Sequence, residues 1–193
     1  YLLLGTFASA IVLFGTAFIY GAAQSTNLYE IAAAVSLAEV NWTLLIIGAA
    51  LLVVGFGFKV AAVPFHAWTP DVYHGAPSSV TAFMSVGPKA AGFAVMGRVF
   101  YYAFDGMITD WTPILVALCI LTMAVGNIVA LAQTNIKRMI AYSSIAHAGY
   151  AMLGVISGTV EGQNAMITYL IIYAFMNIGS FGIVILLNKG DEI

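Results

Sequence analysis

FKVAAVPFHAWTPDVYHGAP, residues 58–77, is the stretch that decides the fold of this chain. It continues an apolar run, carries Lys59 within that run and reaches Pro64 a few residues later. Proline lacks a backbone N–H, so Pro64 leaves the carbonyl of Val60 without its helical partner. We therefore predict one broken helix near Lys59–Pro64. Such irregular backbone is tolerated inside a membrane only where protein buries it or a hydrated cavity adjoins it.

The composition is that of an integral membrane protein. Of 193 residues, 62% are hydrophobic and 7% are charged, with a mean hydropathy of +1.01. These values exclude an ordinary water-soluble domain. The net charge of −2 and the absence of any basic cluster larger than Lys137–Arg138 argue against nucleic acid as a partner. Cys119 is the single cysteine, so the chain offers neither a disulfide framework nor a cysteine-ligated iron–sulfur site.

Hydropathy predicts an all-α fold, a polytopic bundle of transmembrane helices that forms a single domain over residues 1–193. An apolar helix needs roughly 20 residues to cross the hydrocarbon core, and the chain has six runs of about that length. The predicted spans are 2–22, 43–69, 78–104, 112–132, 138–157 and 166–187. The chain starts at Tyr1 without an initiator Met and stops soon after an apolar run. We expect it to be an internal piece of a larger membrane protein.

Charge asymmetry predicts the orientation. Lys137 and Arg138 lie between the fourth and fifth predicted spans, and Lys189 follows the sixth, which puts all three on one side of the membrane. The positive-inside rule makes that side, including the Lys137–Arg138 loop and the C-terminal end, cytoplasmic. Trp111 falls near a predicted span end, where an amphipathic ring is expected at the lipid headgroups.

Two lysines inside apolar runs are the main functional signal. A charged amine at the bilayer centre costs at least about 2.5–3.5 kcal/mol, so Lys59 and Lys89 need a reason to be there. Snorkelling to the headgroups is the structural alternative, but Lys89 lies roughly 16 Å along its helix from the start of the span. Pro88 precedes Lys89 and frees the carbonyl of Met84, which supplies a local acceptor. We expect both lysines to transfer protons, with coupled titration if they face a common hydrated path.

Polar stripes on the last two spans could extend such a path. Ser143, His147 and Tyr150 are spaced i, i+4, i+7 and share one helical face. A second stripe on the sixth span consists of Tyr169, Tyr173, Asn177 and Ser180. Hydroxyl and imidazole groups donate and accept hydrogen bonds, so facing stripes can carry protons. The same residue types also join membrane helices without any transport role, and the sequence leaves both interpretations open.

The region after Pro64 also contains three possible metal ligands, namely His66, Asp71 and His74. Their spacing runs across Pro70 and fixes no common ligand face, so a metal site is disfavoured. A rigid turn that leads into the next span, with Pro77 at its start, explains the motif better. We assign His66 a supporting role at the break.

Two long segments resemble a known family. They are FKVAAVPFHAWTPDVYHGAPSSVTAFMSVGPKAAGF and ALAQTNIKRMIAYSSIAHAGYAMLGVISG. Together they resemble the antiporter-like membrane subunits of the proton-pumping NADH:quinone oxidoreductase, respiratory complex I, and in particular its subunit N family. The Mrp-type cation/proton antiporters are relatives. The resemblance runs through nearly all of the chain.

The resemblance implies an antiporter-like inverted-repeat fold, with this chain covering roughly helices six to eleven. It implies that Lys59 modulates proton transfer, that Lys89 carries the proton and that His147 receives it. A glutamate partner of Lys59 would lie upstream of Tyr1 and a terminal lysine downstream of Ile193. The implied partners are the other membrane subunits of complex I in a bacterial inner membrane. NADH, flavin, iron–sulfur clusters and quinone would reside in partner subunits, with no cofactor in this chain. The alternative function is a subunit of a Na⁺/H⁺ antiporter.

Overall fold

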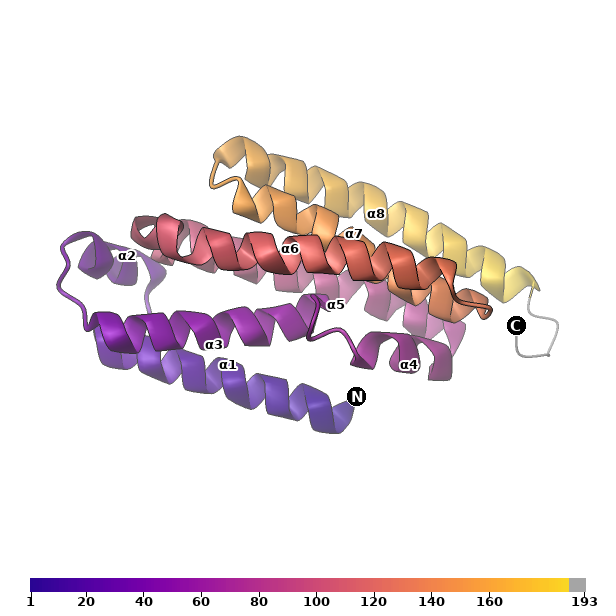
Figure 1. The fold of residues 1–193 in the computed structure, drawn as a ribbon, viewed down its shortest axis with the longest axis horizontal. Helices are drawn as coiled ribbons and strands as arrows, with labels where there is room; N and C mark the ends of the chain where they lie inside the picture. The colour runs from indigo at the N-terminus through magenta and orange to yellow at the C-terminus, as the bar shows by residue number, and fades with distance from the viewer. Residues whose placement is uncertain (188–193) are drawn as a thin grey trace.

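The computed structural model describes residues 1–187 and builds them almost entirely from helices (Figure 1). In chain order they are α1 (Leu2–Ala23), α2 (Leu28–Ser36), α3 (Trp42–Val60), α4 (Trp68–Gly75), α5 (Ser78–Arg98), a π-turn (Val99–Ala103), a 3₁₀ turn (Asp105–Met107), α6 (Ile108–Leu131), α7 (Ile136–Ile156) and α8 (Val160–Leu187). Five helices in this part of the chain, α1, α3, α6, α7 and α8, are long and apolar enough to cross a membrane. The predicted all-α transmembrane fold is confirmed, with five of the six predicted spans; α5, which holds the predicted span 78–104, does not meet the same criterion of length and hydropathy.

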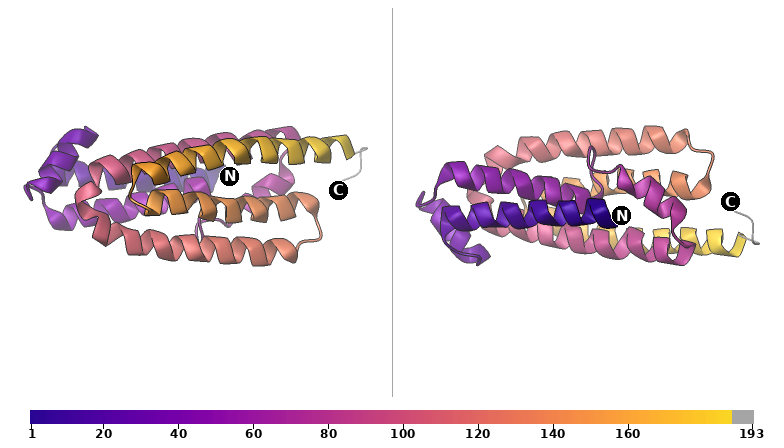
Figure 2. Two further views of the ribbon diagram at one scale, coloured as in Figure 1. Left: turned by 90° about the horizontal axis from the view of Figure 1, so that it is seen from above. Right: turned by 90° about the horizontal axis from the view of Figure 1, so that it is seen from below.

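The long helices run side by side along one axis, as the two further views show (Figure 2). Helix α1 packs on α3, α6 on α7, and α8 on both α5 and α7. Short α4 packs mainly on α7 and lies at the end of the bundle opposite α2 (Figure 1). This arrangement surrounds the middle of α5 with α3, α7 and α8, and so places Lys89 inside the bundle.

Close contact between α1 and α3 depends on glycine. A Cβ at Gly48 would lie 2.7 Å from Ile19 Cγ1 and 2.9 Å from the Gly15 carbonyl oxygen. Because lipid is as apolar as a core side chain, membrane helices associate through close packing, which small residues permit. Gly48 is therefore a packing residue of the pair.

A Gly48→Val substitution should loosen α1 from α3. Overpacking typically costs about 1–3 kcal/mol, and the clash here involves backbone atoms that cannot rotate away. We expect a lower midpoint of thermal unfolding for the purified protein in detergent. Gly179→Val is the matched control, since no atom lies within 4 Å of a Cβ at that position. Equal midpoints for the two variants would contradict the packing role of Gly48.

The predicted helix break is confirmed, but its cause differs from the one expected. Helix α3 ends because Ala61 adopts left-handed backbone angles, with φ 63° and ψ 40°. The Ala62 N–H donates to the Gly57 carbonyl at 2.8 Å, and the Ala61 N–H donates to Phe58 at 3.2 Å. This pair of bonds is the Schellman motif that closes helix ends. The helix therefore stops before Pro64 is reached.

The segment between α3 and α4 is held by hydrogen bonds to its neighbours. The Val63 N–H donates to Thr122 Oγ1 of α6 at 2.9 Å, and the Trp68 indole N–H donates to the Phe58 carbonyl at 3.1 Å. These contacts satisfy backbone groups that the break exposes, as burial inside a membrane requires. Helix α4 then runs from Trp68, so the expected continuous span 43–69 is corrected to a helix that ends at Val60.

Other expected boundaries also change. The predicted loop 23–42 contains α2, whose start is capped by the Asn27 side chain accepting the Tyr29 N–H at 2.9 Å. Ile31 and Val35, one turn apart, bury the inner face of this short helix. The expected span 78–104 is α-helical only to Arg98 and continues as a π-turn.

Helix α7 begins at Ile136, which changes the basis of the orientation argument. Lys137 and Arg138 lie in the first turn of this helix and not in a loop. Lys189, the third cation of that argument, lies outside the described residues. The cytoplasmic orientation therefore stays a prediction.

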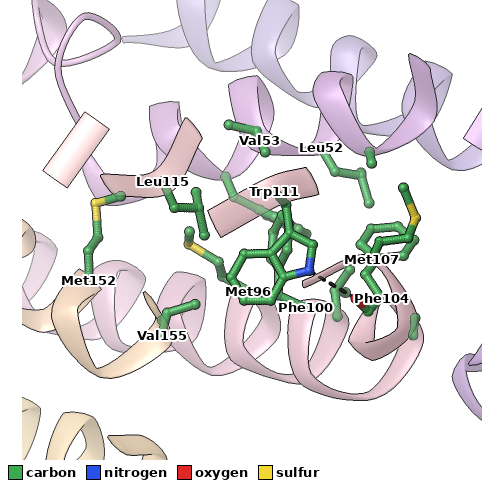
Figure 3. Close-up of a cluster of buried hydrophobic side chains, with 14 of the residues drawn as sticks. Leu52, Val53, Met96, Phe100, Phe104, Met107, Trp111, Leu115, Met152 and Val155 are labelled. Carbon is green, nitrogen blue, oxygen red and sulfur yellow. Dashed lines mark hydrogen bonds between the residues drawn. The ribbon is translucent and has the colours of Figure 1, made fainter. Parts of the chain in front are cut away.

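A large aromatic and aliphatic core lies where α6 starts (Figure 3). The Trp111 side chain is buried at 4% exposure within it, and its indole N–H donates to the Phe104 carbonyl at 2.9 Å. Trp111 therefore packs against protein within this chain, and its expected position at the level of the headgroups stays a prediction. The Phe104 carbonyl follows the π-turn and also accepts the Met107 N–H at 3.0 Å, so the indole, which needs a partner when buried, shares it with the 3₁₀ turn.

Candidate functional site

Lys89 is the centre of a buried polar cluster. It lies on α5, is 2% exposed and donates from Nζ to the Ser144 carbonyl at 2.6 Å and also to Ser144 Oγ. Within residues 1–187 the only side-chain ion pair joins Arg138 and Asp71, so no carboxylate in this part of the chain pairs with Lys89. A buried ammonium held only by neutral acceptors is costly, and loss of a proton removes that cost.

Ser144 connects Lys89 to α8. The Tyr173 hydroxyl donates to Ser144 Oγ at 3.0 Å and approaches the Ser85 carbonyl at 3.3 Å. Asn177, one turn further along α8, donates to Ser85 Oγ. The predicted α8 stripe therefore reaches the lysine site through Tyr173 and Asn177. The hydroxyl of Ser144 is the group that both Lys89 and Tyr173 contact.

Pro88 lacks an N–H and so leaves the Met84 carbonyl free to accept a hydrogen bond in the same cluster. The Met84 carbonyl, which loses its helical donor to Pro88, accepts the Tyr73 hydroxyl at 3.4 Å. Tyr73 belongs to α4, is fully buried, and packs with Ala141 and Ile145 of α7. The short helix after the break thus supplies a side chain to the lysine site.

His147 lies one turn beyond Ser144 on α7, and its Nδ1 is hydrogen-bonded to the Tyr169 hydroxyl. Its ring centroid is 5.2 Å from that of Tyr173 and 5.7 Å from that of Tyr150. The Tyr150 hydroxyl in turn accepts Asn127 Nδ2 at 2.9 Å. Predicted residues His147, Tyr150 and Tyr173 are thus brought together, and they continue the polar cluster away from Lys89.

Of two adjacent serines on α7, the structure places Ser144 at the lysine, and the role predicted for Ser143 stays a prediction. Within residues 1–187, the Ser143 side chain makes no hydrogen bond, whereas Ser144 binds Lys89. Both serines lie close to the His147 face, four and three residues before it. Helical spacing alone could not separate them, because the choice depends on where α5 and α8 pack against α7.

Lys59 lies outside the polar cluster around Lys89. With Pro88 and Gly92 it lines a cavity of about 480 Å³ between α1, α3 and α5. In the described part of the chain its side chain makes no hydrogen bond and no ion pair. Lys89 instead points from α5 towards α7. The described residues therefore do not bring the two lysines into one hydrogen-bonded network.

The remaining predicted residues lie at the break. Pro64 is exposed, and the His66 ring packs edge-on against Tyr142 with centroids 6.5 Å apart. His66 Nδ1 is buried without a hydrogen-bond partner among residues 1–187. No group of three His, Cys, Asp or Glu side chains in that range is arranged to hold a metal ion.

A membrane bundle with a broken helix and a buried lysine defines an antiporter-like membrane protein. A family model described as "NADH:quinone oxidoreductase/Mrp antiporter, TM" matches residues 1–192. The chain belongs to this family.

Individual relatives agree with that assignment. NADH-quinone oxidoreductase subunit N of Trichlorobacter lovleyi is 52% identical over 193 residues, which are all of this chain and 40% of that protein. The structure of respiratory complex I from Thermus thermophilus with bound aureothin matches 95% of this chain and 38% of its own, at 40% identity and a TM-score of 0.79. The Mrp complex of a Dietzia species matches 94% of this chain and 33% of its own, at 26% identity and a TM-score of 0.85. This chain thus spans about 40% of the length of the first of these relatives.

Proposed function

We propose that this chain is part of a proton-translocating membrane subunit of an NADH:quinone oxidoreductase in a bacterial inner membrane. The observation that carries the proposal is Lys89, buried at 2% exposure and held by neutral oxygen atoms of Ser144. The identity of 52% to a subunit N protein supports the complex. Other membrane subunits would be its partners, and NADH oxidation, flavin, iron–sulfur clusters and quinone would belong to partner subunits.

In this proposal Lys89 takes up a proton, holds it as a buried ammonium and releases it to the cluster around Ser144. Burial disfavours the charged amine, so release needs little driving force. The Ser144 hydroxyl accepts from Lys89 and from Tyr173, and the Tyr173 ring lies against His147. A proton leaving Lys89 would therefore move along α7 and α8 towards His147, with water completing the contacts.

Lys59 would act on Lys89 through its charge. It adjoins the cavity beside Pro88 and Gly92 of α5, outside the hydrogen-bonded cluster of Lys89 and Ser144. A charge there acts across a medium of low dielectric constant, where like charges repel over several ångströms. Protonation of Lys59 would thus favour proton release from Lys89, which is a modulating role.

Loss of proton pumping in a Lys89→Ala variant tests the proposal. The variant is made in the full-length subunit, the intact complex is reconstituted in vesicles, and proton uptake is measured per NADH oxidised. Pumping should be lost because Ala carries no proton. Phe83→Ala is the matched control, because Phe83 lies on the same helix and is 72% exposed. Unchanged pumping in Lys89→Ala would overturn the proposal.

The likeness to the Mrp complex, with a TM-score of 0.85, favours a Na⁺/H⁺ antiporter subunit as the second candidate. The same vesicles distinguish the two functions. Proton movement driven by a Na⁺ gradient without NADH would support the antiporter, whereas movement that requires NADH oxidation supports the oxidoreductase.

A further inference from the structure

Two adjacent cations at the start of α7 hold the two ends of α4. Arg138 Nη1 pairs with Asp71 Oδ1 at 2.7 Å, in the first turn of α4. Lys137 Nζ donates to the carbonyl of Ala76 at 2.7 Å, at the other end of α4. The contacts lie at the end of the bundle opposite α2, where α4 and the start of α7 meet (Figure 1).

The turn between α6 and α7 also contacts Arg138, at its backbone and at its side chain. The Arg138 backbone N–H donates to Asn135 Oδ1 at 3.1 Å, and its Nε donates to Gln133 Oε1 at 3.4 Å. The guanidinium therefore reaches Asp71 from a side chain with few alternative positions. The contact with Asp71 is a single charge-assisted bond from Nη1, which links the start of α7 to the first turn of α4.

The two helices that these contacts join also meet at the lysine site. Helix α4 supplies Tyr73, which is fully buried and donates to the Met84 carbonyl of α5, about one turn before Lys89. Helix α7 supplies Ser144 itself, the group that binds Lys89. Trp68 and Tyr73 of α4 pack with Ala141 and Ile145 of α7 in one buried cluster. A displacement of α4 along α7 would therefore move Tyr73 relative to Ser144.

We propose that Lys137 and Arg138 are positioning residues that hold α4 on α7 and so set the geometry of the Lys89–Ser144–Tyr73 cluster. The inference rests on the proposed function of Lys89. It adds that the contacts of Lys137 with Ala76 and of Arg138 with Asp71 position the groups around Lys89. Neither residue touches the transferred proton.

We expect loss of the Arg138–Asp71 ion pair to change the geometry of the lysine site more than the free energy of unfolding. The Asp71 side chain is 75% exposed and that of Arg138 is 32% exposed. Pairs of this exposure contribute little to the free energy of unfolding. A misplacement of reacting groups by 1 Å can nevertheless slow a reaction by about 100-fold. Loss of the pair should thus reduce proton transfer while the subunit still assembles.

A charge-reversal series in the intact complex tests the inference. Asp71→Arg and Arg138→Asp should each lower proton pumping per NADH oxidised by about tenfold, within the range that small misplacements cause. Each should also speed amide hydrogen exchange in residues 69–76 without changing exchange in α8. The double variant D71R/R138D restores opposite charges and should recover pumping and protection together. Asp110→Arg is the matched control, since Asp110 is exposed and forms no ion pair among the described residues.

The outcomes separate this inference from the function on which it rests. Normal pumping in both single variants, or failure of the double variant to recover it, would overturn the positioning role. Faster exchange with unchanged pumping would overturn it too, because α4 would then move without effect on Lys89. A Lys89→Ala variant measured alongside reports on the proposed function alone, and its normal pumping would overturn that function first.

Discussion

A Lys89→Arg variant should lose proton pumping although it keeps a positive charge at the site. Arginine is not deprotonated in proteins, so it can stabilise a buried network but cannot release a proton. Pumping per NADH oxidised should fall by about 100-fold or more, the contribution of a positioned acid–base group. The measurement uses the intact complex in vesicles with a pH-sensitive dye.

The guanidinium of the Lys89→Arg variant is larger than the lysine amine and could prevent assembly. A Lys89→Met variant tests the same role without that larger group. Methionine matches lysine in length and is readily buried, so assembly of the complex should be retained while pumping is lost. Co-purification of the partner subunits reports on assembly. If Lys89→Arg pumps as well as the unmodified subunit, Lys89 is a fixed charge and not a proton carrier.

Ser144→Ala should lower pumping by about tenfold or more, because a hydrogen bond to a charged group is worth about 1.5–3 kcal/mol. The variant removes the hydroxyl that Lys89 and Tyr173 share, and leaves Lys89 with only the Ser144 carbonyl. Ser144→Thr retains a hydroxyl and should recover part of the activity. The rate of NADH-driven proton uptake is the quantity measured.

Ser143→Ala is a matched control on the adjacent residue. The same atoms are removed from the same helix, at a position whose side chain makes no hydrogen bond within residues 1–187. Its pumping should stay close to that of the unmodified subunit. Equal losses in the two alanine variants would show that Ser144 acts through helix packing and not through its hydroxyl.

Much of the candidate site follows from residue chemistry along the chain. Lys89 stands out because a charged group in an apolar run is rare, and that argument needs no partner to be known. His147, Tyr150 and Tyr173 follow from the periodicity of polar residues on single helices. Ser144 does not, because the choice between two adjacent serines depends on the rotation of α7 against α5. Tyr73 was missed for the same reason, since its contact with Met84 spans two helices.

The all-α membrane fold, the broken helix and the position of Lys89 within an apolar run can all be read from the residues in order along the chain. Each of these follows from local properties, namely hydropathy, backbone hydrogen bonding and position within an apolar run. Three further features are visible in the tertiary structure alone: α3 ends at Val60, Lys59 lines a cavity apart from the Lys89–Ser144 cluster, and Lys137 and Arg138 bind α4. These features depend on how helices rotate and pack against one another. Hydropathy is uniform around such helices and so does not specify their rotation.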